Sequence, residues 1–174
     1  MYPGKYAEQN PDRSAFVMAA TGERVSYQEF EARSNRVAHY LADKGLGFQD
    51  HYSIFMENNN RYLESCAAGE RSGLYFTCIN SFLTSDELAY IINNSESQIL
   101  ITSMSKLEAA QEALAQCTAM KEVLVVGAGD ADLPEGMSDF ASTLSKYPET
   151  PLERELLGAA MLYSSGTTGR PKGI

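Results

Sequence analysis

The sequence predicts an α/β protein in which helices flank a mainly parallel sheet built from β-α-β units. One observation is a set of short apolar runs whose apolar character is continuous, which is typical of strands covered on both faces. Another is that segments of helical periodicity separate these runs. With 174 residues and 44% hydrophobic content, the chain can bury a core, and we expect it to fold largely as one unit.

The first elements expected are a β-hairpin and a helix. The hairpin strands are predicted at 15–20 and 24–26. Ser26 is followed three residues later by Glu29, which is the pattern of a capping box at a helix start. The helix that follows turns one apolar side inward, with Phe30, Val37 and Leu41.

Further helices are predicted by two more capping boxes and by one weaker pattern. The boxes are Thr84-x-x-Glu87 and Ser105-x-x-Glu108, and the helix without a box spans about 61–72. The residues expected to face inward are Leu88, Ile91 and Ile92 after the first box, and Leu107, Ala110, Leu114 and Cys117 after the second.

Five buried strands are expected between these helices. They are predicted at 53–56, 74–79, 99–102, 123–126 and 159–163. Glycines and prolines interrupt residues 127–151, which indicates a surface excursion with a short helix near 138–147.

The bulk charge argues against two classes of partner. Fourteen Lys and Arg against 23 Asp and Glu give a net charge of −9, which disfavours binding to nucleic acid and to anionic membranes. The N-terminus lacks an apolar signal core and no stretch approaches the length of a membrane span, so we expect a cytoplasmic protein. Cys66, Cys78 and Cys117 lack the spacing of a zinc site and are interpreted as reduced, mostly buried residues.

The most informative segment is a loop at residues 164–173, which directly follows the last predicted strand. It combines glycines, whose backbone can approach an anion closely, with hydroxyls that donate to phosphate oxygens and with the cations Arg170 and Lys172. Gly173 stands where a Walker A loop needs Ser or Thr, so a different nucleotide-binding family is indicated. Ser164 and Ser165 lack the Gly-x-Ser-x-Gly elbow of a hydrolase, which leaves amidase-type hydrolysis a weak competitor.

Every position from Met161 to Lys172 fits the phosphate-binding signature of the AMP-forming, adenylate-forming enzymes. Residues 69–80 and 24–30 resemble the early core of bacterial fatty-acyl-CoA synthetases, and the resemblance covers nearly the whole chain. The Glu-Arg-Ser-Gly-Leu-Tyr stretch at 70–75 favours acyl-CoA synthetases over amino-acid adenylation domains.

The resemblance implies the N-terminal subdomain of the adenylate-forming fold, present incompletely. Residues 1–174 would be a partial AMP-binding domain that stops just after the loop at 164–173. It also implies ATP, Mg²⁺ and coenzyme A as substrates or cofactors, with a fatty acid activated to an acyl-adenylate and then to an acyl-CoA thioester. The residues that the resemblance assigns to the ATP phosphates are Ser164, Ser165, Gly166, Thr167, Thr168, Gly169 and Lys172, with Ser164 also next to the magnesium ion.

Three alternatives stay open at this point. The main catalytic residues of the resembled enzymes would come after residue 174, so the chain alone is expected to be inactive. It could instead be a stand-alone, non-catalytic α/β module that binds a partner protein. The substrate of the parent enzyme could also be an aromatic, small or amino acid.

Overall fold

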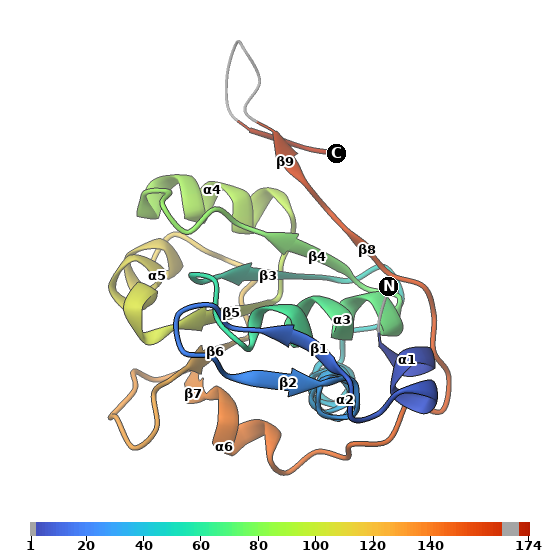
Figure 1. Cartoon of the computed structure of the whole chain (residues 1–174). Helices are drawn as coiled ribbons and strands as arrows, with labels where there is room; N and C mark the ends of the chain where they lie inside the picture. The colour runs from blue at the N-terminus through green and yellow to red at the C-terminus, as the bar shows by residue number, and fades with distance from the viewer. Residues whose placement is uncertain (1–2, 165–170) are drawn as a thin grey trace.

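A six-stranded, wholly parallel sheet forms the centre of the computed structural model, which describes residues 3–164 and 171–174 (Figure 1). Its strand order is β7-β6-β5-β3-β4-β8. The strands are β3 (His51–Phe55), β4 (Tyr75–Cys78), β5 (Ile99–Ser103), β6 (Glu122–Val126), β7 (Met137–Asp139) and β8 (Ala159–Ala160). The predicted α/β class with a mainly parallel sheet is therefore confirmed.

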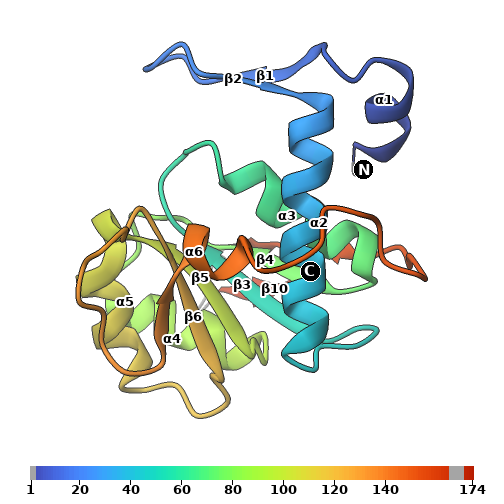
Figure 2. The same ribbon diagram turned by 90° about the horizontal axis from the view of Figure 1, so that it is seen from below.

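Helices cover both faces of this sheet, as Figures 1 and 2 show. One face packs on α2 (Tyr27–Asp43), α3 (Tyr62–Ser72) and α6 (Phe140–Leu144), and the other on α4 (Ser85–Asn94) and α5 (Leu107–Leu114). Within β5, Ile99 and Ile101 join the first of these cores while Leu100 joins the second. Successive side chains of a strand point to opposite faces, so burial on both faces explains the continuous apolar runs.

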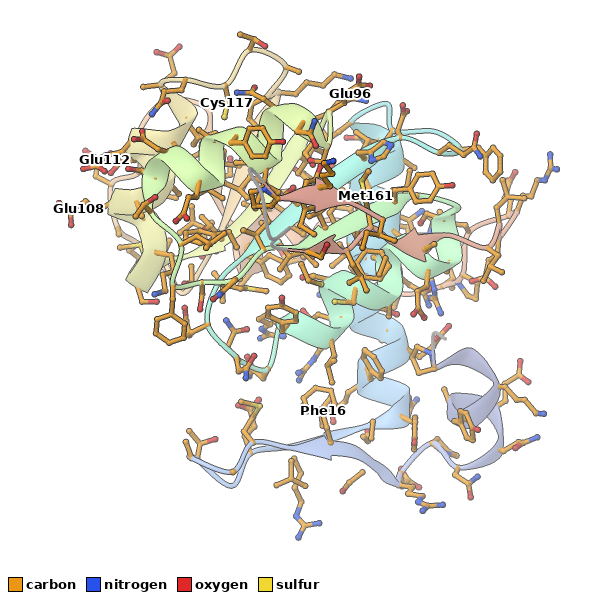
Figure 3. All side chains as sticks on the ribbon, turned by 90° about the horizontal axis from the view of Figure 1, so that it is seen from above. Phe16, Glu96, Glu108, Glu112, Cys117 and Met161 are labelled. Atoms are coloured by element: carbon orange, nitrogen blue, oxygen red, sulfur yellow. The ribbon has the colours of Figure 1, made fainter. Side chains whose placement is uncertain are left out.

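The N-terminal elements pack on the beginning of α2 and away from the sheet. They are α1 (Gly4–Gln9), which was not predicted, and the antiparallel pair β1 (Ser14–Val17) and β2 (Arg24–Ser26). Figure 3 shows this hairpin, with Phe16, beside the near end of α2. The ring of Phe16 meets that of Phe30 edge-on at 5.7 Å between centroids, and Tyr6 stacks on Tyr27 at 5.3 Å. One aromatic pair thus packs the predicted hairpin against α2, and the other packs α1 against it.

The three predicted capping boxes have different outcomes. Those at Ser26 and Thr84 are present in full, with each hydroxyl accepting from the glutamate N–H and each carboxylate accepting from the cap N–H. The box at Ser105 is wrong, because α5 begins only at Leu107, after a 3₁₀ turn η1 (Met104–Lys106). The Ser105 hydroxyl instead donates to the Glu57 carboxylate at 2.5 Å.

The strand predicted at 159–163 is also wrong in part, since it forms two separate strands. β8 joins the edge of the parallel sheet, and β9 (Tyr163–Ser164) leaves it. Gly158 permits the approach to the sheet, because a Cβ there would lie 2.1 Å from the carbonyl oxygen of Gly69 and 2.4 Å from that of Leu74. The chain can reach this edge only with a glycine at that position.

Candidate functional site

The two ends of the predicted loop form a small antiparallel strand pair that lies beyond the edge of the sheet (Figure 1). β9 pairs with β10 (Lys172–Gly173), so Ser164 stands opposite Lys172 and Tyr163 opposite Gly173. The backbone N–H of Ile174 donates to the Leu162 carbonyl at 2.8 Å and extends the pairing. The two ends of the loop are therefore held side by side.

Five of the predicted phosphate-binding residues lie outside the described residues. They are Ser165, Gly166, Thr167, Thr168 and Gly169. Of the predicted set, the structure places Ser164 and Lys172, and both are exposed. Within the part of the chain that the structure describes, Lys172 has no ion-pair partner, so its charge is available to an anion.

Two hydrogen bonds fasten the hairpin to α4. The Tyr90 hydroxyl donates to the Pro171 carbonyl at 3.0 Å, and the Tyr163 hydroxyl donates to Asn94 Oδ1 at 2.8 Å. Burial, with a smaller contribution from Tyr90, raises the pKa of Tyr163, which keeps its hydroxyl a donor at neutral pH. The strands on both sides of the loop thus have fixed positions on one helix.

A cleft of about 890 Å³ lies beside this hairpin. Its lining includes Asp86, Glu87, Tyr90, Asn93, Gln116 and Pro171. Hydrogen bonds from the Thr84 backbone and side chain lower the pKa of Glu87, so its carboxylate stays charged. Two carboxylates would repel a polyphosphate. The chemistry favours anion binding at the exposed Ser164–Lys172 end of the hairpin and disfavours it in the cleft.

The residues around Ser164 can supply only part of a magnesium site. Mg²⁺ prefers six oxygen ligands and usually keeps several waters, with one or two carboxylates and the phosphates of a substrate completing the shell. Ser164 offers one exposed hydroxyl oxygen. Among residues 3–164 and 171–174, no three His, Cys, Asp or Glu side chains gather as a metal-binding group. Ser164 could therefore supply one ligand of such an ion, and the other ligands would have to come from elsewhere.

Sequence reasoning did not identify Tyr90 and Asn94 as part of this site. Both are on α4, about 70 to 80 residues before the loop, and only the tertiary fold brings them to it. It also missed the proximity of Cys66 and Cys78, whose sulfur atoms are 3.7 Å apart. Tyrosine and asparagine on a helix face carry no motif, so no signal in the sequence could have found the two α4 residues.

The two histidines have local roles in the structure. The Nε2 atom of His39 lies 2.9 Å from the Thr150 carbonyl oxygen, and the ring of His51 stacks on Tyr75 at 5.0 Å. These contacts account for both side chains through packing and loop attachment. None of the described helices is both long and apolar enough to cross a membrane.

Comparison with known proteins gives a family match over most of the chain. A family model described as "AMP-binding enzyme" matches residues 5–174. The 3-oxocholest-4-en-26-oate–CoA ligase of Rhodococcus rhodochrous is 32% identical over 168 residues, which cover 94% of this chain and 30% of that protein. A medium/long-chain-fatty-acid–CoA/3-oxocholest-4-en-26-oate–CoA ligase of Mycolicibacterium smegmatis is 30% identical with the same coverage. The chain thus spans about a third of the length of the curated relatives it matches.

Solved structures show the same fold. An anthranilate CoA ligase in complex with anthranoyl-AMP aligns with a TM-score of 0.84 and 22% identity, covering 100% of this chain and 34% of that one. A "putative long-chain-fatty-acid CoA ligase" from Rhodopseudomonas palustris aligns with a TM-score of 0.82 and 22% identity over 99% of this chain and 42% of that one. The parallel sheet with helices on both faces is therefore the arrangement found in adenylate-forming CoA ligases.

Proposed function

This chain belongs to the AMP-binding enzyme family, and on that premise we propose that residues 1–174 form part of the AMP-binding domain of an ATP-dependent acid–thiol ligase. In the first reaction a carboxylate oxygen attacks the α-phosphorus of ATP, and pyrophosphate leaves. In the second, the thiol of coenzyme A attacks the acyl-adenylate carbonyl carbon and AMP leaves. Enzymes accelerate such phosphoryl chemistry mainly by aligning the reactants and stabilising charge on the phosphate oxygens.

The observation that carries this proposal is the register of the β9–β10 hairpin. It sets Ser164 opposite Lys172, and in the sequence the Ser, Gly and Thr residues of the predicted loop lie between these two. We propose that Ser164, Ser165 and Thr167 donate hydroxyl hydrogen bonds to the β- and γ-phosphates, and that Lys172 supplies a counter-charge. We assign phosphate binding through backbone N–H groups, which can face an anion, to three further residues: Gly166, Thr168 and Gly169.

Magnesium would assist by neutralising charge on the departing pyrophosphate. We place Ser164 next to it, because the exposed hydroxyl oxygen can enter the coordination shell beside phosphate oxygens and water. The residues of this chain would hold the nucleotide in position, and the ion would arrive with it.

For the acyl substrate we propose a medium- or long-chain fatty acid or a similarly large apolar carboxylic acid. The support is the activity of the relatives, which are ligases for fatty acids and for 3-oxocholest-4-en-26-oate. The cytoplasmic location expected from the sequence belongs to the same proposal.

The test is ATP–pyrophosphate exchange in the whole protein with a fatty-acid substrate. Lys172→Ala and Thr167→Ala should each lower the exchange rate by about 100-fold or more, which is the cost of removing one preorganised donor to a charged transition state. Lys146→Ala removes an exposed lysine far from the hairpin and should leave the rate unchanged. Unchanged exchange in both loop variants would sink the assignment of this loop to ATP.

A further inference from the structure

Cys66 and Cys78 form a close thiol pair that bridges two elements. Cys66 lies on α3 and Cys78 ends β4, and their Sγ atoms are 3.7 Å apart. A disulfide has an S–S bond of about 2.05 Å, so the sulfurs need to approach by less than about 2 Å. Both thiols are free and partly buried.

The pair has a route to solvent. Cys78 and Tyr62 line a cavity of about 420 Å³ at the carboxyl end of the sheet, together with Met56, Glu57, Asn80 and Phe82. Phe82 is 90% exposed, so the cavity opens at the surface. A small peroxide, similar in size to water, can therefore reach the Cys78 sulfur.

The surroundings separate the two thiols into a nucleophile and a partner. Hydrogen bonds from Cys66 and from the Tyr62 hydroxyl lower the pKa of Cys78 to about 7, in opposition to burial. The same bond and the burial of Cys66 raise the pKa of Cys66. Because Cys78 lines the cavity and Cys66 is not among its lining residues, Cys78 is the sulfur that an oxidant would meet first, and its thiolate is the reactive form.

We propose that Cys66 and Cys78 are a modification site at which a hydroperoxide forms a reversible disulfide between α3 and β4. The Cys78 thiolate attacks one peroxide oxygen, the O–O bond breaks, and the released alkoxide or hydroxide takes up a proton. The resulting sulfenic acid is attacked by the Cys66 sulfur, which forms the S–S bond and releases water. In sum, the two thiols lose two electrons and two protons, and the peroxide is reduced to an alcohol or water.

The disulfide would link α3 covalently to β4 at the wall of this cavity. Tyr62, Cys66 and the carboxyl end of β4 then move as one unit, so the opening of the cavity is set by the redox state. This site is distinct from the β9–β10 hairpin and does not depend on the proposed ligase activity.

The experiment is peptide mapping of the native protein after treatment with hydrogen peroxide. Remaining thiols are blocked by alkylation in denaturant, and trypsin then separates the three cysteines into the peptides 62–71, 72–106 and 107–121. We expect a dithiothreitol-sensitive cross-link between the first two peptides. It should form more than about tenfold faster in the native chain than in the urea-unfolded chain, because the fold holds the sulfurs together.

Cys117 provides the internal control. It lies just past α5, and burial raises its pKa, so it should stay unpaired. Cys117→Ala should retain the cross-link and Cys78→Ala should lose it, while the wild-type map decides the matter even if a variant does not fold. A native chain without the 62–71/72–106 cross-link, or one in which Cys117 pairs as readily, overturns the proposal.

Discussion

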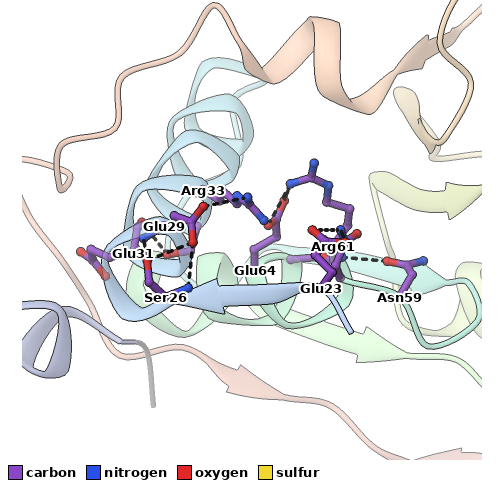
Figure 4. Close-up of polar contacts among 11 residues, drawn as sticks. Glu23, Ser26, Glu29, Glu31, Arg33, Asn59, Arg61 and Glu64 are labelled. Atoms are coloured by element: carbon purple, nitrogen blue, oxygen red, sulfur yellow. Dashed lines mark hydrogen bonds and ion pairs between the residues drawn. The ribbon is translucent and has the colours of Figure 1, made fainter. Parts of the chain in front are cut away.

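Glu64 is a buried carboxyl group surrounded by a polar network, which Figure 4 shows. It is 2% exposed, and its carboxylate lies 3.5 Å from the Arg61 guanidinium. Burial raises the pKa of Glu64 to about 7, although Arg61 and Arg33 act in the opposite direction and Glu23 adds a small rise. Desolvation thus outweighs the ion pair at this position.

This pKa makes stability depend on pH. Between the ordinary value of 4.5 and about 7 the folded chain binds the Glu64 proton and the unfolded chain releases it, so the free energy of unfolding falls as pH rises through that window. We expect Glu64→Gln to remove this fall, and to be more stable than wild type at pH 8 by up to about 3 kcal/mol. Urea unfolding of both proteins at pH 5 and pH 8 measures the difference.

Glu23→Gln is the matched control, because Glu23 belongs to the same network and is exposed. Its unfolding free energy should keep most of the pH dependence of wild type, because Glu23 is the smallest of the contributions to the Glu64 pKa. Identical pH dependence in wild type and Glu64→Gln would show that the buried carboxyl group stays ionised in the folded chain.

The same sequence pattern, a Ser followed three residues later by a Glu, has different structural roles near the starts of two helices, α2 and α5. Ser26 accepts the Glu29 N–H at the start of α2, whereas Ser105 donates to Glu57. We expect Ser26→Ala to lower the free energy of unfolding by about 1 kcal/mol, the usual cost of losing an N-cap. Ser105→Ala should leave the helicity of α5 unchanged, since Leu107 begins the helix without a side-chain cap.

Urea unfolding measures the change in the free energy of unfolding. Amide hydrogen exchange in the first turn of each helix measures how well the start of that helix is formed. Faster exchange at the start of α2 in Ser26→Ala, with no change at the start of α5 in Ser105→Ala, is the expected result. Equal acceleration in both helices would mean that Ser105 acts as a cap in solution.

The main elements of the sheet could be predicted because burial on both faces leaves a continuous apolar run. β7 and α1 could not, since β7 has three residues and α1 has neither a side-chain cap nor a buried residue. The Ser105 box failed because a competing carboxylate, Glu57, comes from a distant strand end. Periodicity and capping report local preferences, whereas β7, α1 and the start of α5 depend on contacts between distant segments.

The candidate site, like the fold, could be predicted only in part. The loop at 164–173 has a composition that points to phosphate by itself. Its attachment to Tyr90 and Asn94 depends on how the chain returns past α4, which no local pattern encodes. The split of 159–163 into β8 and β9 has the same cause, because only β8 finds a partner in the sheet.

At the scale of the whole molecule, Arg71 connects three segments that are far apart in the sequence. It is fully buried on α3, and its guanidinium lies 2.5 Å from Glu31 of α2 and 3.5 Å from Glu155 of the segment that leads to β8. The backbone of the same segment donates from Leu156 to the Arg71 carbonyl at 3.0 Å. The hairpin with Ser164 and Lys172 follows directly, so its position depends on this connection.

We therefore expect Arg71→Leu to lower the free energy of unfolding by about 3 kcal/mol, because it leaves two carboxylates without their buried counter-charge. The partial exposure of Glu31 and Glu155 keeps the cost at the lower end for a broken buried ion pair. Urea unfolding measures it, with Arg154→Leu as the control, since Arg154 lies in the same segment and is exposed. If Arg71→Leu unfolds at the wild-type urea concentration, apolar packing alone holds the segment on α3. A loss of stability confined to Arg71→Leu, with faster amide exchange from Leu156 to Ala160, would instead show that this ion-pair cluster positions the segment that leads to the β9–β10 hairpin.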